Sequence, residues 1–192
     1  MVDVAAAAAA IVRGEIVAYP TETFYGLAVD ARNETALAKL RALKGRGAEK
    51  AFSLLVLNRD MLASLCLEIS AVADRLITLH WPGPLTLALP ARPGLPASIV
   101  ADDCVAVRVS PHPLAQALVA GADRPITATS ANPAGAAPPR TASEVAAYFP
   151  PPTCLILDGG ATRGGQPSTL ARVRGENVEI LRQGAVVLAD AG

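Results

Sequence analysis

Three segments of the chain combine polar side chains with glycine or proline in patterns that suit ligand binding. The first, residues 19–27, reads YPTETFYGL, and an apolar strand over residues 16–19 stops there at a proline and runs into hydroxyls and one carboxylate. Ligands of α/β proteins commonly lie beyond the carboxyl ends of strands, so this segment is typical of the mouth of a binding site. A well-capped strand-to-loop turn would have the same composition, and these nine residues leave both readings open.

The second segment is a basic cluster at the end of a predicted helix. Residues 39–50 hold five Lys or Arg residues and one acid, in a chain whose 17 basic and 17 acidic side chains balance to zero. Gly45 and Gly47 flank Arg46, so that backbone N–H groups, the guanidinium and the neighbouring Lys44 can approach one phosphate. Basic residues also favour helix C-termini and Gly45 is a common C-cap, so a structural reading stays open.

The third segment, residues 125–135, reads PITATSANPAG, a short buried strand that ends in hydroxyls and an amide. At an extended strand end, Ser130 and Asn132 would point to one side, which is the geometry of a small polar receptor. A plain turn would explain Asn132 followed by Pro133 equally well.

Several classes of site are not indicated. The sequence lacks GxxxxGK[ST], GxGxxG, HExxH and GxSxG patterns, and we expect no protein-held metal. His80 ends an apolar helix and His112 lies between prolines, so both favour structural roles. Three dispersed cysteines in apolar surroundings indicate buried thiols and a reducing cytoplasm. No apolar run approaches the roughly 18 residues that span a membrane.

Helix and strand signals alternate along the chain, which favours an α/β fold with a mixed sheet in one domain over residues 1–192. The composition, 52% hydrophobic and only 4% aromatic, suits helices packed closely on a sheet. Helices are predicted over residues 5–13, from the Asn33 cap to Gly45, from the Ser70 cap to residue 80, and over 114–119 and 143–148. Strand candidates are residues 16–19, 53–57, 85–89, 105–109, 126–129, 154–157, 169–173 and 178–181.

Seven motifs in the same order resemble the YrdC-like family. They are YPTETFYGL at 19–27, KxR at 44–46, WPGPLTL at 81–87, VAVRVS at 105–110, TSANPAG at 129–135, the Ser168-Thr169 pair after residues 158–160, and ILRQGA at 180–185. The resemblance extends from about residue 5 to 187 and implies a twisted, open mixed sheet flanked by helices. It also implies a threonylcarbamoyl-AMP synthase, which makes L-threonylcarbamoyladenylate and pyrophosphate from L-threonine, bicarbonate or CO2, and ATP. That product serves the N6-threonylcarbamoyl modification of adenosine 37 in tRNA.

The resemblance also implies roles for individual residues. Those expected to hold ATP are Lys44, Arg46, Thr86, Ser130, Asn132 and Arg182, and of these Lys44 and Arg46 are expected to act on the reacting phosphate. Those expected to line the threonine pocket are Thr21, Tyr25, Arg108 and Ser168. We expect Mg2+ to accompany ATP as a countercharge. The general base for the threonine amine stays open, with Glu22 as one candidate.

The chain departs from the family pattern at three places. Gly47 replaces the proline after KxR, residues 138–140 read PPR in place of Ser-Pro-Thr, and Gln183 replaces the proline of ILRPG. The chain resembles the short bacterial form without an extra C-terminal domain, which passes its product to a separate tRNA threonylcarbamoyl-transferase complex. Two alternatives remain: a YciO-like paralogue, and an RNA-binding or ribosome-associated module that contacts tRNA or double-stranded RNA. The zero net charge disfavours the latter.

Overall fold

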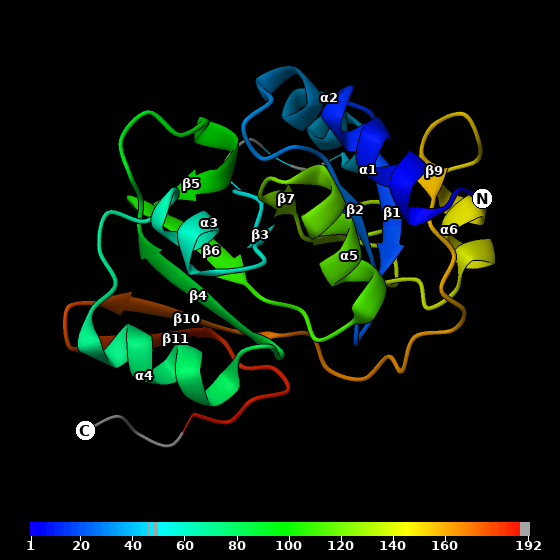
Figure 1. Ribbon diagram of the computed structural model, residues 1–192. Helices are drawn as coiled ribbons and strands as arrows, with labels where there is room; N and C mark the ends of the chain where they lie inside the picture. The colour runs from blue at the N-terminus through cyan, green and yellow to red at the C-terminus, as the bar shows by residue number, and fades with distance from the viewer. Residues whose placement is uncertain (46, 48–49, 189–192) are drawn as a thin grey trace.

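Two β-sheets with helices packed around them form the structure, a computed structural model that describes residues 1–45, 47 and 50–188 (Figure 1). The helices are α1 (Val4–Val12), α2 (Glu34–Lys44), α3 (Arg59–Ala63), α4 (Ala71–His80), the 3-10 helix η1 (Ala97–Ile99), α5 (Pro113–Ala122) and α6 (Ala142–Tyr148). The strands are β1 (Val17–Pro20), β2 (Tyr25–Ala28), β3 (Leu54–Leu55), β4 (Leu85–Pro90), β5 (Val100–Ala101), β6 (Cys104–Arg108), β7 (Ile126–Thr127), β8 (Thr129–Ser130), β9 (Leu155–Ile156), β10 (Thr169–Arg174) and β11 (Asn177–Arg182).

The smaller sheet is built on the hairpin of β1 and β2, in the order β8-β2-β1-β9. β1 pairs antiparallel with β2 and parallel with β9, and all residues of β1 and β2 are buried. From the sequence, no strand is predicted over residues 25–28. They form a second buried strand instead, because the segment turns back on itself and the apolar half of YPTETFYGL pairs with residues 17–20.

The larger sheet has the order β11-β10-β4-β6-β3-β7, with β5 paired to β6. The pairs β10–β4 and β3–β6 are parallel, whereas β10–β11, β4–β6 and β3–β7 are antiparallel. The predicted α/β class with a mixed sheet is confirmed. The strand expected over residues 126–129 divides, because β7 joins the larger sheet and β8 joins the smaller one.

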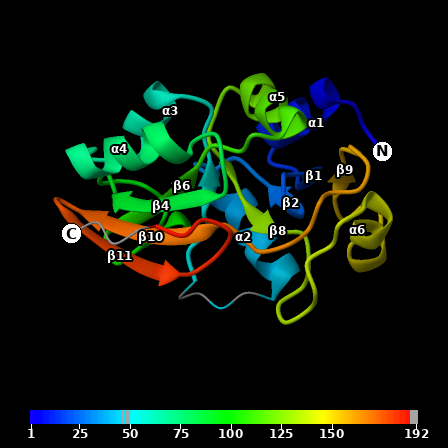
Figure 2. The same cartoon turned by 90° about the horizontal axis from the view of Figure 1, so that it is seen from below.

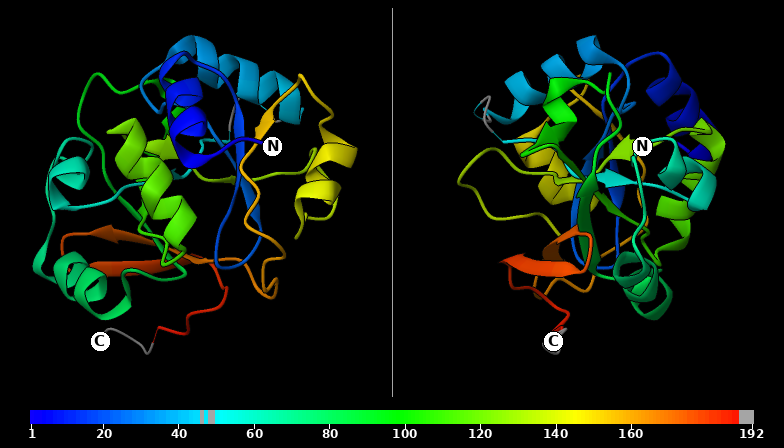
Figure 3. Two further views of the ribbon diagram at one scale, coloured as in Figure 1. Left: turned by 45° about the vertical axis from the view of Figure 1, so that its right-hand side comes forward. Right: turned by 90° about the vertical axis from the view of Figure 1, so that its left-hand side faces the viewer.

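Helices cover both sheets. α1 and α5 lie side by side against β1, where they enclose one apolar core with Ile11, Tyr19 and Leu118 (Figure 3). A second core includes Leu37, Leu40, Leu87 and other aliphatic residues. α4 packs against β4, and α6 packs beside β9 at the opposite end of the molecule (Figure 2). Most strands are therefore enclosed, whereas the edge strand β11 stays largely exposed.

Local signals in the sequence set the helix ends. Asn33 Oδ1 accepts a hydrogen bond from Ala36 N at 3.0 Å, and Ser70 Oγ accepts one from Ala73 N at 3.3 Å, so both predicted N-caps are confirmed. Gly45 closes α2 with φ of 60°, a left-handed conformation that glycine adopts at little cost. The chain can therefore turn sharply after Lys44.

Two further expectations concern the cysteines and the membrane. Cys66, Cys104 and Cys154 are free and buried, as predicted, and burial raises the pKa of Cys66 to about 12 and that of Cys154 to about 11. Within residues 1–45, 47 and 50–188, the helices are all too short or too polar to cross a membrane.

Thr127 joins the two sheets. Its Oγ1 accepts a hydrogen bond from Val29 N at 3.1 Å and donates one to Leu27 O at 2.9 Å, and its own N–H donates to Val29 O at 3.0 Å. Its carbonyl accepts a hydrogen bond from Tyr19 Oη at 3.1 Å. These residues are fully buried, so water cannot replace the lost bonds.

We expect Thr127→Val to lower the free energy of unfolding by about 1–3 kcal/mol, because the change keeps the side-chain shape and leaves Val29 N–H and Leu27 O without their partner. Thr78→Val is the matched control, since Thr78 is exposed and donates to Asp74 O within α4; it should change stability by less than about 0.5 kcal/mol. Urea unfolding followed by circular dichroism measures both. Equal effects would contradict the role given to Thr127.

Candidate functional site

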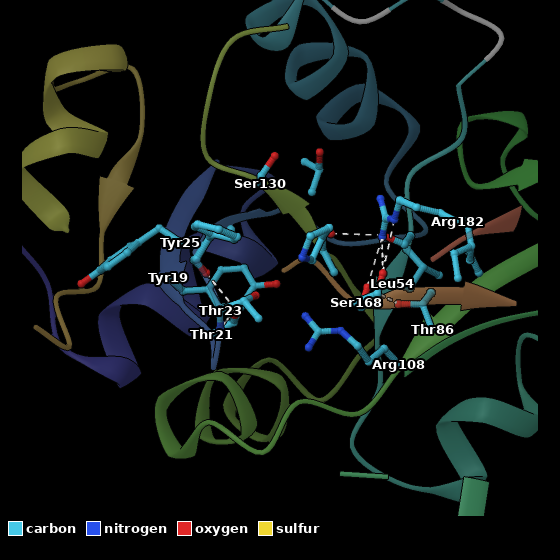
Figure 4. A pocket seen from close by; sticks show the side chains of 18 of the residues that line it. Tyr19, Thr21, Thr23, Tyr25, Leu54, Thr86, Arg108, Ser130, Ser168 and Arg182 are labelled. Carbon is cyan, nitrogen blue, oxygen red and sulfur yellow. Dashed lines mark hydrogen bonds between the residues drawn. The ribbon is translucent and has the colours of Figure 1, made fainter. Parts of the chain in front are cut away.

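A cavity of about 240 Å³ lies between the two sheets (Figure 4). The hairpin of β1 and β2 and strand β8 form one wall, and strands β3, β4, β6, β10 and β11 contribute to the other. Among the residues that the structure describes, no Asp or Glu lines it, whereas two arginines and several hydroxyls do. Such a lining suits an anionic ligand.

The cavity gathers most of the residues that the sequence predicted. Those predicted residues that line it are Thr21, Tyr25, Thr86, Arg108, Ser130, Ser168 and Arg182. They come from both sheets and from segments up to about 160 positions apart in the chain, so one cavity, and not two separate sites, collects the residues expected for ATP and those expected for threonine.

Thr86, Ser168 and Arg182 form one hydrogen-bonded group. Thr86 Oγ1 lies 2.8 Å from Ser168 Oγ, and Arg182 Nη2 donates to Ser168 O at 2.8 Å and to Ser168 Oγ at 3.3 Å. Strand pairing explains the proximity, since residue 170 of β10 lies opposite both Thr86 of β4 and Arg182 of β11. Residues expected on the ATP side therefore touch a residue expected on the threonine side.

Thr21 and Tyr25 line the cavity while their hydroxyls hold the surrounding backbone. Thr21 Oγ1 donates to Phe24 O at 2.8 Å and so closes the turn between β1 and β2. Tyr25 Oη donates to Gly160 O at 2.8 Å and accepts from Gly159 N at 3.2 Å, and burial raises its pKa. Both hydroxyls therefore shape the wall.

Lys44 lies behind the cavity wall. Its side chain is buried, and Nζ donates to Ser130 O and, at 2.7 Å, to Asn132 O. The backbone of Lys44 contacts the same turn, because its carbonyl accepts a hydrogen bond from Ala134 N at 2.9 Å. The end of α2 thus fixes the turn that follows β8. Arg46, the other half of the predicted phosphate clamp, lies outside the described residues.

Asn132 occupies a different position from Ser130. β8 ends at Ser130, so the extended geometry that would place both side chains on one side does not reach Asn132. Its Nδ2 donates to Pro133 O at 2.9 Å and to Ala136 O at 2.7 Å, which closes the turn. Its buried Oδ1 has no partner among the described residues.

The two positively charged side chains in the cavity repel each other. Arg182 is exposed overall, but partial desolvation of its guanidinium lowers its pKa, and the charge of Arg108 lowers it further. The Arg182 guanidinium nevertheless remains protonated at neutral pH, because the pKa of an arginine is ordinarily far above 7. An anion bound between them would offset the desolvation and the repulsion together. The cavity is therefore electrostatically prepared for negative charge.

Glu22 and Ser110 add contacts that the sequence analysis did not predict. The Glu22 carboxylate pairs with Arg108 through Oε1 and accepts a hydrogen bond from Ser110 Oγ at 2.6 Å through Oε2. Ser110 follows Arg108 by two residues in VAVRVS, a spacing that places two side chains on the same side of an extended chain and could have suggested a joint role. His112 is structural, as expected, since its Nδ1 accepts from Leu114 N at the start of α5.

Two of the three departures from the family pattern are next to cavity residues, since Pro139 is bonded to Tyr25 and Gln183 follows Arg182 in the chain. Pro139 O accepts a hydrogen bond from Tyr25 N at 2.9 Å, and Arg140 donates to Thr162 O at 3.2 Å. Gln183 Nε2 donates to Val186 O at 2.9 Å. Both of these segments are thus held by hydrogen bonds to or from the backbone.

Known proteins similar to this chain come from the family that its sequence motifs resemble. The family model for Sua5, YciO and YrdC, described as "Telomere recombination", matches residues 9–184. A threonylcarbamoyl-AMP synthase from Pyrococcus abyssi is 38% identical over 96% of this chain and 54% of its own length, and one from Idiomarina loihiensis is 36% identical over 88% of this chain and 93% of its own length. The chain therefore spans about half of the first relative and nearly all of the second.

A solved structure agrees with these relatives. The crystal structure of P. abyssi Sua5 complexed with L-threonine superimposes with a TM-score of 0.89 at 38% identity, and the match covers 94% of this chain and 54% of that one. The E. coli YciO structure shares the fold, with a TM-score of 0.84 at 22% identity. The family model matches most of the chain, several relatives are more than 30% identical to it, and the fold is shared. These findings confirm the resemblance drawn from the sequence: the chain belongs to the Sua5/YciO/YrdC family.

Proposed function

We propose that this chain is a threonylcarbamoyl-AMP synthase and acts as a nucleotidyltransferase, forming L-threonylcarbamoyladenylate and pyrophosphate from L-threonine, bicarbonate or CO2, and ATP. The observation that carries the proposal is the single cavity in which Arg108 and Arg182 face a ligand space without a lining acid among the described residues. The names of the relatives and the L-threonine bound to P. abyssi Sua5 support it.

The reaction joins two anions, which explains the need for this charge distribution. The amine of threonine adds to CO2 and loses a proton to give a carbamate. A carbamate oxygen then attacks the α-phosphorus of ATP, and the bond to the β,γ-pyrophosphate breaks. No covalent enzyme intermediate is needed. Positioning and electrostatic stabilisation dominate such phosphoryl chemistry.

We assign each of these residues a proposed role from its position. Arg108 is the group suited to the threonine carboxylate, because a guanidinium can donate to both oxygens. Arg182, with Ser168 and Thr86, is proposed to contact the carbamate and the nucleotide. Lys44 carries its charge just behind Ser130 and, with Arg46, supplies the positive side for the triphosphate.

Mg2+ would reach this site on the phosphates of ATP. Among residues 1–45, 47 and 50–188, no group of three or more His, Cys, Asp or Glu side chains is placed to hold a metal ion. The donor set of the cavity is cationic or hydroxylic, which fits a phosphate-bound ion and does not fit a protein-held one. The ion would add countercharge to the triphosphate.

The product is proposed to serve the threonylcarbamoyl modification of tRNA through a separate transferase complex. The direct contact with RNA that the resemblance implied stays a prediction. Salt-dependent binding of tRNA would be its signature.

The function is tested by incubating the protein with ATP, L-threonine and 13C-labelled bicarbonate and analysing the products by mass spectrometry. We expect threonylcarbamoyl-AMP carrying the label, together with pyrophosphate, only when all three substrates are present. Pyrophosphate release that ignores threonine and bicarbonate would refute the proposal. Adenylate formation with another amino acid in place of threonine would instead favour a YciO-like paralogue.

Arg182→Ala should lower turnover at least about tenfold, because it removes a charge-assisted contact of about 1.5–3 kcal/mol from the reacting anion. Arg163→Ala is the matched control: it removes an equal charge from an exposed position on the loop before Ser168. Its turnover should stay within about twofold of the unmodified protein, as expected for a solvent-screened charge. Similar losses in both variants would indicate a general charge effect and not a contact in the cavity.

Lys44→Met should also lower turnover at least about tenfold, since it removes the ammonium behind Ser130. Lys39→Met, an exposed change on the same helix, serves as its control. Steady-state rates at saturating ATP separate the two, and thermal unfolding reports the part of the loss that comes from the turn after β8. Normal rates for Lys44→Met would limit the role of this residue to holding the turn after β8.

A further inference from the structure

Glu22 lies beside the cavity, where its carboxylate pairs with Arg108. Its neighbours Thr21 and Thr23 line the cavity, and Glu22 does not. Its side chain is 16% exposed, and both carboxylate oxygens are engaged, Oε1 with Arg108 and Oε2 with Ser110. A general base must reach the proton that it removes, so this placement argues against that role for Glu22.

Arg108 uses only part of its hydrogen-bonding capacity in this pair. Its side chain is 8% exposed, and Nη1 meets Glu22. Nε and Nη2 have no hydrogen-bond partner in the described part of the chain, and the guanidinium points into the cavity (Figure 4). A planar guanidinium fixed at one nitrogen keeps the others in a defined plane.

The partner of this pair is itself held in place. Ser110 Oγ, which donates to Glu22, accepts a hydrogen bond from His112 N at 3.2 Å, and Ser110 O accepts one from Gln116 Nε2 at 2.9 Å. The start of α5 therefore fixes Ser110, Ser110 fixes the carboxylate, and the carboxylate fixes the guanidinium. A buried charge without such a partner would be costly.

From this geometry we propose that Glu22 is a positioning residue: it acts as the counter-ion that holds Arg108 in the orientation that receives the substrate carboxylate, and it does not take the proton of the substrate amine. The inference rests on the proposed function, in which that substrate is L-threonine. It assigns to the carboxylate of YPTETFYGL a role in substrate affinity.

Steady-state kinetics of Glu22→Gln distinguish the two roles. Glutamine keeps the size and one acceptor but removes the charge, so the KM for threonine should rise at least about tenfold while kcat changes by less than about threefold. Loss of a general base would instead lower kcat by about 100-fold or more at saturating threonine. The second pattern would overturn the proposal.

A double-mutant cycle tests whether Glu22 acts through Arg108. Arg108→Lys alone should raise the KM for threonine, and adding Glu22→Gln to it should have little further effect, because the guanidinium to be oriented is gone. Full additivity would contradict the proposal. Asp30→Asn breaks the Arg124–Asp30 ion pair away from the cavity and is the matched control; it should leave the KM for threonine unchanged.

A spectroscopic measurement separates this inference from the proposed function. In protein labelled with 15N-arginine, rotation of the Arg108 guanidinium should be slow in the unmodified protein and faster in Glu22→Gln, whether or not the protein makes any product. Unchanged Arg108 signals would overturn the positioning role. Absence of product from the unmodified protein, with the expected change in these signals, would refute only the synthase function.

Discussion

The fixed relation between the two sheets is the constraint on which the site depends. The chain leaves the larger sheet after Thr127 and joins the smaller one at Thr129, and the buried hydrogen bonds of Thr127 hold the crossing in place. Lys44 secures the next turn through the carbonyls of Ser130 and Asn132. The cavity walls belong to different sheets, so a small shift at this crossing would move Ser130 relative to Arg108 and Arg182.

The charged side chains at the cavity come from both sheets. Arg108 and Arg182 come from strands of the larger sheet, and the one carboxylate that neutralises Arg108 comes from the hairpin of the smaller sheet and stays outside the lining. Arg182 thus keeps the cavity positive, while Glu22 offsets the buried charge of Arg108. Preorganised charge of this kind needs no rearrangement when an anion arrives.

Sequence reasoning succeeded where the signal is local. Asn33, Ser70 and Gly45 were identified as caps because capping depends on neighbours within four residues. The division into two sheets could not be predicted from local patterns, because the pairing of residue 85 with Thr169 joins segments far apart in the chain. The same limit applies to the site. Motifs identified the cavity residues, whereas the contacts of Glu22 depend on residues that lie more than 80 positions further along.

The pair of hydroxyls at Thr86 and Ser168 gives the cavity an adaptable hydrogen-bond direction. Either oxygen can be the donor across their 2.8 Å contact, and Arg182 donates to Ser168 Oγ in both cases. If Thr86 donates, the Ser168 proton is available to an anionic ligand; if Ser168 donates, the Thr86 proton is available instead. In the proposed reaction, a rotation of these two hydrogens, without movement of any heavy atom, would let this wall adapt as the neutral amine becomes a charged carbamate.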